Sequence, residues 1–381
     1  MARHRDARAR RPRRLALLVL ALLIGLTTVA VVRGIDDGAE CVGDVGINWP
    51  AAGRVYLGGV DERSTTAAAP ERAFTVAAAN GMRQVRVLVG VDAAIAAWTE
   101  DPARATDGLR RMVDDAAARG IVLVLSAYPD LPMITALAGR EYDSWAAAQQ
   151  DLVTPGSVPW RRFEEWLRTV VPPLSTDPAV VAWEVVNEPG YMLGMDSGAV
   201  PVDQGLAFFD HFAGLLKDLG VRTLNGGGRP VYDPMTLTDQ QLAGYLEHVD
   251  VLDDHLYPSG PTTVGGAAAA PTGTAEQGRQ AVEATARWFA RARELVDRPE
   301  MPAMLGEVGS QPTDWFTGVL TAATERGWPV LAWGYDAYDA NEFTDEVNPA
   351  TFRILAAAAT DARELNGDLA VVVGSPRCRP D

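Results

Sequence analysis

The stretch Val-Val-Ala-Trp-Glu-Val-Val-Asn-Glu-Pro, residues 180–189, decides how the rest of the chain is interpreted. Most of its first seven residues are β-branched or aromatic, which predicts a buried strand. Pro189 must end that strand, because proline cannot continue a ladder of hydrogen bonds. Asn187 and Glu188 are neighbours, and neighbours on a regular strand point to opposite faces. If both serve one site, we expect a twist or bulge at the carboxyl end of the strand.

Strand and helix patterns alternate along the remaining chain. Besides 180–189, the predicted strands are 44–49, 84–89, 121–127, 221–225, 251–256, 303–307 and 330–333. The predicted helices are 70–79, 107–118, 160–171, 204–219, 239–246, 276–296, 313–326 and 351–365. Eight βα units with continuously apolar strands predict a single-domain (β/α)8 TIM barrel, with functional residues at the carboxyl ends of the strands.

A doubly wound open sheet is the alternative fold. It is disfavoured because no Gly-x-Gly-x-x-Gly motif or phosphate loop follows a predicted strand. Two long segments, 128–158 and 259–274, are expected to form the rims of a cleft.

The N-terminus differs in composition from the rest of the chain. Residues 1–33 hold eight arginines and one aspartate, and the apolar run Leu15 to Val32 follows the arginines at 3–14. This pattern predicts a cleaved export signal or a membrane anchor, followed by one catalytic domain over residues 34–381. Either way the arginines stay in the cytoplasm, and everything after Arg33 is expected outside it, secreted or tethered to the membrane.

The part of the chain after Arg33 is strongly acidic, since the whole chain already has a formal charge of −16. This argues against binding to nucleic acid and is compatible with a neutral sugar polymer. Cys41 and Cys378 are the two cysteines of the chain. Outside the cell they could form a disulfide that joins the ends of the domain, although two unpaired buried thiols are the alternative.

Two glutamates stand at the carboxyl ends of the fourth and seventh predicted strands, Glu188 and Glu307. These strands lie across the mouth of an eight-stranded barrel from each other, so the two carboxylates could converge. Such a pair suits glycoside hydrolysis, with one carboxyl as acid/base and the other as nucleophile. Each glutamate alone could be a surface residue at a strand end.

Arg86 lies between two valines on a buried strand and therefore needs an anionic partner. Glu307 and Glu184 are the available candidates. An arginine beside Glu307 would hold that carboxylate ionised and ready to attack.

Aromatic and imidazole groups supply the remaining candidates. His255 and Tyr257 are two residues apart and share a face of their strand. There the tyrosine could orient a carboxylate, and the histidine could contact the substrate or the other carboxyl. Trp333 ends the eighth strand and could form a stacking floor for a sugar. Each of the three could instead be a packed residue, and Tyr128 is a weaker candidate for a sugar contact.

These motifs together resemble the family 5 glycoside hydrolases, which are clan A (β/α)8 barrels. The resemblance rests on Trp183-Glu184-x-x-Asn187-Glu188-Pro189, His255-x-Tyr257, Gly306-Glu307 and Trp333. It spans nearly all of the chain after Arg33. It implies a retaining mechanism with Glu188 as acid/base, Glu307 as nucleophile and Asn187 bound to the 2-hydroxyl of the reacting sugar. It also implies that Arg86 and Tyr257 flank the nucleophile and that Trp333 lies under the sugar ring.

One position departs from the family pattern. Many members carry a histidine at the end of the third strand, where this chain has Leu125-Ser126-Ala127-Tyr128. Tyr128 could occupy part of that space. The departure leaves the subfamily open, and with it a plain cellulase assignment.

The sequence lacks the motifs of metal-dependent and serine-dependent catalysis. The four histidines form no His-x-His or His-Glu-x-x-His pair, so neither a metal nor another cofactor is expected. No Gly-x-Ser-x-Gly elbow is present for a nucleophilic serine. We therefore predict a monomeric retaining hydrolase of β-linked neutral polysaccharides or oligosaccharides, of β-glucan or β-mannan type. A transglycosidase and a non-catalytic carbohydrate-binding barrel are the alternatives.

Overall fold

The computed structural model describes residues 43–50, 52–57, 71–227, 237–258, 273–309, 312–333 and 349–366. The chain divides into two compact units, 1–40 and 41–381, and all the described residues lie in the second. The expected signal or anchor and both cysteines, Cys41 and Cys378, lie outside the described residues. Within the described ranges, no helix has the length and apolar character needed to cross a membrane.

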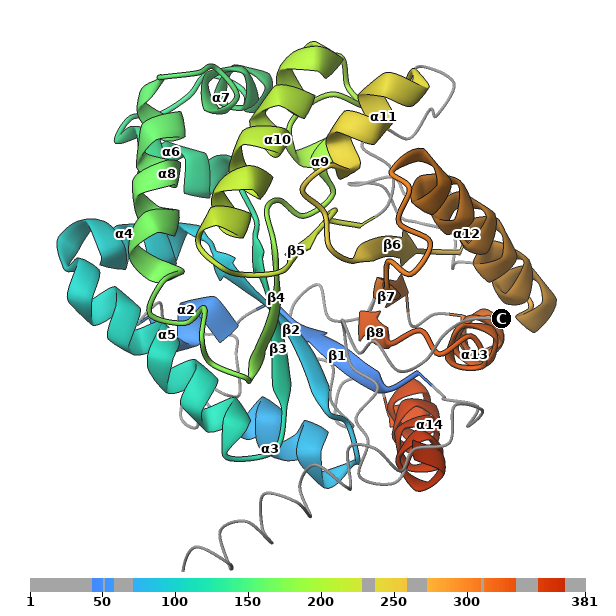
Figure 1. Cartoon of the computed structure of the whole chain (residues 1–381). Helices are drawn as coiled ribbons and strands as arrows, with labels where there is room; N and C mark the ends of the chain where they lie inside the picture. The colour runs from blue at the N-terminus through green and yellow to red at the C-terminus, as the bar shows by residue number, and fades with distance from the viewer. Residues whose placement is uncertain are drawn as a thin grey trace, which may run out of the picture. The chain divides into compact units, whose positions relative to one another are not determined.

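Eight parallel strands form a barrel surrounded by helices (Figure 1). The strands are β1 (Val45–Trp49), β2 (Gln84–Gly90), β3 (Val122–Ala127), β4 (Val180–Glu184), β5 (Thr223–Leu224), β6 (Leu252–Leu256), β7 (Ala303–Gly309) and β8 (Val330–Trp333). Their order is β5-β4-β3-β2-β1-β8-β7-β6, and a parallel bridge from Leu224 to Val251 joins the two outer strands. The (β/α)8 barrel expected from the sequence is therefore confirmed, and an open sheet is excluded.

The helices that follow the strands pack against the outside of the barrel. They are α2 (Ala52–Tyr56), α3 (Arg72–Ala79), α4 (Asp92–Glu100), α5 (Pro102–Ala117), α6 (Leu131–Ala138), α7 (Trp145–Leu152), α8 (Val158–Val170), α9 (Pro189–Met192), α10 (Val202–Asp218), α11 (Asp239–Leu246), α12 (Ala275–Leu295), α13 (Thr313–Thr324) and α14 (Pro349–Asn366). The large apolar core lies between strands and helices. A second, small apolar cluster draws one residue from each of six strand segments: Val124, Ala182, Leu224, Val251, Met304 and Leu331.

Several predicted boundaries were wrong, and local chemistry explains them. The strand expected over 180–189 ends at Glu184. The helix expected from residue 107 begins at Pro102, because the Asp101 side chain caps it by accepting from the backbone N–H groups of Ala103 and Arg104. The segment 128–158 contains α6 and α7, and its expected place at the rim of a cleft stays a prediction. The other expected rim, 259–274, lies almost wholly outside the described residues.

Candidate active site

Arg86 on β2 is 1% exposed and donates to five polar side chains inside the barrel. Its guanidinium donates to Oε2 of Glu184 at 2.5 and 3.1 Å and to Oε1 of Glu307 at 2.8 Å. It also donates to Oδ1 of Asn48 at 2.9 Å and to Oδ1 of Asn187 at 2.6 Å. Both of the acidic partners considered from the sequence therefore contact this arginine.

Burial alone would lower the pKa of Arg86, but the negative charges of Glu184 and Glu307 outweigh it and raise that pKa. The pKa of Glu184 is raised, chiefly because this carboxyl is buried. The arginine thus stays charged beside Glu307.

Glu307 lies on β7 next to a bulge at Gly306. Asp254 pairs with Leu305 and His255 pairs with Glu307, so Gly306 has no partner on β6. Two buried side chains compensate for the bulge. Oδ1 of Asp253 accepts from the N–H of Gly306 at 2.6 Å, and Nδ2 of Asn48 donates to its carbonyl at 2.9 Å.

The bulge also explains why residue 306 is a glycine. A Cβ there would lie 2.4 Å from an oxygen of Asp253, which is too close for any side chain. The backbone that carries Glu307 is therefore held by its neighbours on both sides.

Asn187 and Glu188 follow β4 in irregular backbone. Glu188 adopts a left-handed conformation with φ 42° and ψ 68°, which is uncommon for a residue other than glycine. Its N–H donates to the carbonyl of Gly226 at 2.6 Å, and the N–H of Asn187 donates to the carbonyl of Ala127 at 3.0 Å. This turn, in place of the expected twisted strand, lets two adjacent side chains serve one site.

His255 lies between the two glutamates. Its Nδ1 is 3.1 Å from Oε1 of Glu188 and 3.5 Å from Oε2 of Glu307. One carboxylate oxygen from each glutamate and a ring nitrogen of His255 all lie within 4.8 Å of one another. The two carboxylates predicted from distant parts of the sequence therefore converge.

The pKa values of His255 and Glu188 depend on each other and on the charges around them. Burial would lower the pKa of His255, but the nearby carboxylates of Glu307, Asp253 and Glu188 raise it well above the ordinary value, which favours the charged form of the ring. Burial would raise the pKa of Glu188, yet the hydrogen bond and charge of His255, together with the charge of Arg86, lower it. Both shifts favour placing the proton shared by His255 and Glu188 on the imidazole.

The aromatic candidates lie at the same end of the barrel. The hydroxyl of Tyr257 donates to Oε2 of Glu307. Tyr128 is half-buried directly after β3, and burial followed by the charges of Asp130, Glu307 and Glu188 raises the pKa of its phenol. Trp333 is the last residue of β8 and is half-buried at its carboxyl end, level with Gly309 of β7. Whether Tyr128 and Trp333 touch a sugar stays a prediction.

Sequence reasoning missed four residues that shape the site, namely Asn48, Ser126, Asp253 and Gly227. Asn48 and Ser126 were readable as polar residues on otherwise apolar strands, and both accept from Arg86. Asp253 and Gly227 gave no comparable signal, because their contacts depend on how β6 and the loop after β5 are placed.

Among the described residues, three sets of groups converge closely enough to hold a cation. One of them, Asp210, Glu247 and His248, does not belong to the carboxylate site. The two sets in the site are Glu188, His255 and Glu307, and Glu184, Asp253 and His255. Arg86 already donates to Glu184 and to Glu307, so its positive charge offsets both sets. This arrangement favours acid/base chemistry over metal binding.

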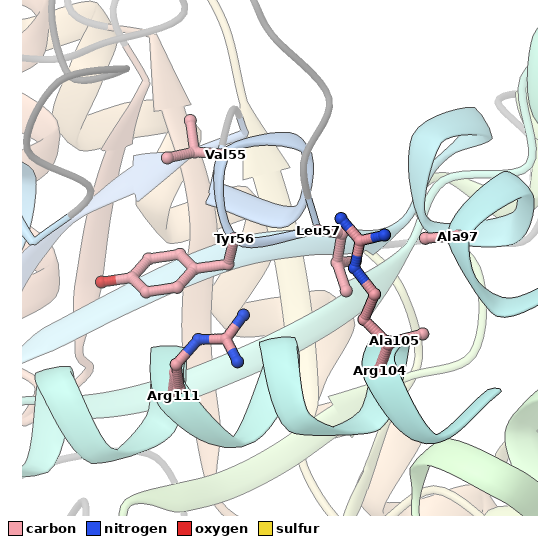
Figure 2. Close-up of a pocket in the computed structure, with 7 residues that line it drawn as sticks. All are labelled: Val55, Tyr56, Leu57, Ala97, Arg104, Ala105 and Arg111. Carbon is pink, nitrogen blue, oxygen red and sulfur yellow. The ribbon is translucent and has the colours of Figure 1, made fainter. Parts of the chain in front are cut away.

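A separate cavity of about 220 Å³ lies between α2, α4 and α5 (Figure 2). Val55, Tyr56, Leu57, Ala97, Arg104, Ala105 and Arg111 line it. None of these residues belongs to the carboxylate site.

Comparison with known proteins supports the fold. No protein-family model and no curated protein sequence matches the chain. Among solved structures, an endo-β-1,4-mannanase from Thermotoga petrophila has a TM-score of 0.57 at 13% identity over 86% of this chain and 78% of its own. A family 5 mannosidase from Rhizomucor miehei has a TM-score of 0.55 at 13% identity, over 85% and 94%.

A GH5_18 protein from Streptomyces cattleya, solved with GlcNAc, has a TM-score of 0.54 at 17% identity, over 87% of this chain and 82% of its own. The chain therefore has the fold of the family 5 glycoside hydrolases, and the resemblance inferred from its motifs is confirmed at the level of the fold.

Proposed function

We propose that the chain is a retaining glycoside hydrolase acting on β-linked neutral polysaccharides or oligosaccharides. One observation carries the proposal: carboxylate oxygens of Glu188 and Glu307 lie within 4.8 Å of each other, around His255. Retaining enzymes place their two carboxyl groups about 5–5.5 Å apart, whereas inverting enzymes leave roughly 6.5–9.5 Å for a water molecule. The observed approach favours double displacement.

In the proposed reaction, Glu307 attacks the anomeric carbon while Glu188 protonates the glycosidic oxygen. The carbon–oxygen bond to the leaving sugar breaks as the bond to Glu307 forms. Water then gives a proton to Glu188 and attacks the same carbon, which releases Glu307. Arg86 and Tyr257 each donate a hydrogen bond to Glu307, so both stabilise its ionised form before attack and after release.

Asn187 is oriented for a role in sugar binding. Arg86 has only donors, so the side-chain oxygen of Asn187 faces it and the amide N–H groups point elsewhere. Those N–H groups can donate to the 2-hydroxyl of the reacting sugar. Tyr128 and Trp333 are proposed to contact the same sugar from the ends of β3 and β8.

The titles of the structural neighbours suggest which polymer to test first. They describe a mannanase and mannosidases, and also an endo-glycoceramidase II from Rhodococcus sp. with a TM-score of 0.51 at 18% identity over 78% of this chain and 74% of its own. We therefore place β-mannan ahead of β-glucan as the substrate.

The decisive experiment measures hydrolysis of β-mannan, β-glucan and their aryl glycosides, with the first anomer formed followed by proton NMR. A retaining hydrolase releases the β-anomer first, and Glu307→Gln abolishes turnover. Release of the α-anomer, or appreciable activity in Glu307→Gln, would contradict the proposed mechanism. Sugar transfer to an added acceptor in place of hydrolysis would identify a transglycosidase. Sugar binding without turnover would indicate a non-catalytic barrel.

We also propose that the protein acts outside the cytoplasm. The arginines at 3–14 and the apolar run Leu15 to Val32 support export or a membrane tether. Fractionation of cells that express the full chain tests this, and recovery in the cytoplasm would contradict it.

A further inference from the structure

Asp253 on β6 is fully buried beneath the site, and its two carboxylate oxygens face different partners. Oδ1 accepts from the N–H of Gly306, which the bulge in β7 leaves without a strand partner. The backbone of Asp253 is fixed by Asn225, which accepts from its N–H at 2.6 Å and donates to its carbonyl at 2.9 Å. Capping the bulge accounts for the contact of Oδ1, but it gives no role to Oδ2.

Oδ2 of Asp253 lies 3.5 Å from Nε2 of His255. Within the described part of the chain, both atoms are buried and neither makes a hydrogen bond of ordinary geometry. A buried carboxylate oxygen and a buried ring nitrogen without partners are each unfavourable, and here each has the other within reach. Hydrogen bonds of this kind are often long in unliganded enzymes and shorten when the substrate binds.

The imidazole has little freedom to turn away from this carboxylate. Gly227 lies against the ring with φ +90°, and a Cβ there would come within 2.4 Å of it. On the opposite edge, Nδ1 faces Glu188 at 3.1 Å. The ring therefore connects a buried carboxylate on one side with the proposed acid/base on the other.

We propose that Asp253 is a positioning residue that acts through Nε2 of His255. It keeps the ring protonated and directs Nδ1–H at Glu188. The ring then holds the proton that Glu188 gives to the leaving oxygen. This inference rests on the proposed function of Glu188. As the glycosidic bond breaks, the shared proton passes from Nδ1 to Glu188 and from Glu188 to the leaving oxygen. When water attacks, one proton returns along the same route, so the pair ends the cycle as it began.

Charged and titratable groups face the ring from several strands. They are Asp253, Asp254 and Tyr257 on β6, Glu184 and Glu188 from β4 and the turn after it, Glu307 on β7 and Arg86 on β2. The carboxylates of Glu307 and Asp253 both raise the pKa of His255. Removing the charge of Asp253 lowers that pKa, so the shared proton is lost at a lower pH.

Asp253→Asn tests the proposal, because the amide oxygen can still cap the bulge while the charge that faces His255 is removed. Asp254→Asn is the matched control. It removes a charge from the next residue, whose Oδ2 accepts from Thr285 on α12 at 2.6 Å. Both are compared with wild type on two aryl glycosides. The phenyl glycoside needs a proton on its leaving group, and the 2,4-dinitrophenyl glycoside does not.

We expect Asp253→Asn to lose about tenfold or more in kcat/KM on the phenyl glycoside and much less on the dinitrophenyl glycoside. The basic limb of its pH profile of kcat/KM should move to lower pH, and the same limb for Asp254→Asn should move far less. Equal losses on both substrates with an unmoved limb would show that Asp253 only caps the bulge, and the proposal would be overturned.

A second measurement does not depend on turnover. Nitrogen NMR of the histidine rings, with His255 assigned through His255→Gln, should show His255 protonated well above its ordinary pKa of about 6.5 in wild type and less so in Asp253→Asn. A wild-type ring that titrates near the ordinary value would overturn the proposal even if the variant fails to fold. If wild type cleaves no glycoside, the proposed function fails, whereas the titration still decides whether Asp253 holds the charge on His255.

Discussion

Nη1 of Arg86 lies 2.8 Å from Oε1 of Glu307, and both side chains are almost fully buried. The same guanidinium donates to Glu184, so one cation serves two carboxylates inside the barrel. Burying a charge is unfavourable unless it is paired and hydrogen-bonded. The arrangement therefore makes the stability of the barrel depend on the residues that prepare Glu307 for attack.

Replacing Arg86 with methionine should destabilise the protein severely. Both carboxylates would remain buried without their cation, and breaking a buried pair in this way costs about 3–5 kcal/mol. Urea denaturation measures the change in the free energy of unfolding. The double variant Arg86→Met with Glu184→Gln should recover part of the loss, because it removes one of the two uncompensated charges. Equal stability of the single and double variants would contradict this account.

Tyr257→Phe should reduce activity with little effect on stability. The hydroxyl donates to Oε2 of Glu307, and a hydrogen bond to a charged group contributes about 1.5–3 kcal/mol. We expect kcat/KM to fall by about 10- to 100-fold. Thermal unfolding measured alongside should stay close to wild type. An unchanged kcat/KM would mean that this hydroxyl does not support the nucleophile.

The strand ends show what the sequence can predict about this site. Arg86 stands out because a charged residue among apolar ones needs a partner, and Glu307 because it ends a predicted apolar strand between Gly306 and Gly309. Both inferences need only local composition and the general rule that barrel sites lie at the carboxyl ends of strands. The eight-stranded barrel itself follows from the same regular alternation.

Other features depend on contacts that no local pattern contains. The left-handed backbone at Glu188 is stabilised by Gly226 from the loop after β5, nearly forty residues away. The bulge at Gly306 is visible only once β6 and β7 are paired. β5 was expected over five residues and has two, and the chain bends soon after it at Gly226 and Gly227, which both have positive φ. Long-range packing decides all three.

Asp254 should make stability depend on pH near neutrality. Burial is the main reason that its pKa rises from 3.8 to about 6. A carboxyl whose pKa is raised by folding stabilises the native state at pH values below its pKa in the unfolded chain. This contribution is lost as the pH rises through about 6. Asp254→Asn should therefore be more stable than wild type at pH 7.5, by on the order of 1–3 kcal/mol, and similar to it at pH 4.

Thermal unfolding of both proteins across this pH range measures the effect. The comparison cancels contributions from other groups, because they are present in both proteins. A variant that is less stable than wild type at pH 7.5 would show that the hydrogen bond from Thr285 outweighs the unfavourable burial of the charge.

Gly227→Ala should impair activity, and Gly220→Ala should not. Both glycines have similar backbone conformations, with φ +90° and φ +82°, so an alanine at either position costs roughly 1–2 kcal/mol of stability. They differ in what a new methyl group would touch. At Gly227 it would lie 2.4 Å from the His255 ring, and at Gly220 nothing lies within 4 Å.

The methyl group at residue 227 should push His255 away from Glu188 and lower kcat/KM, with the loss concentrated on substrates that need a protonated leaving group. Kinetics on the phenyl and dinitrophenyl glycosides, with urea denaturation of both variants, separate this effect from backbone strain. Equal activity of the two variants would mean that the position of His255 is not set by Gly227.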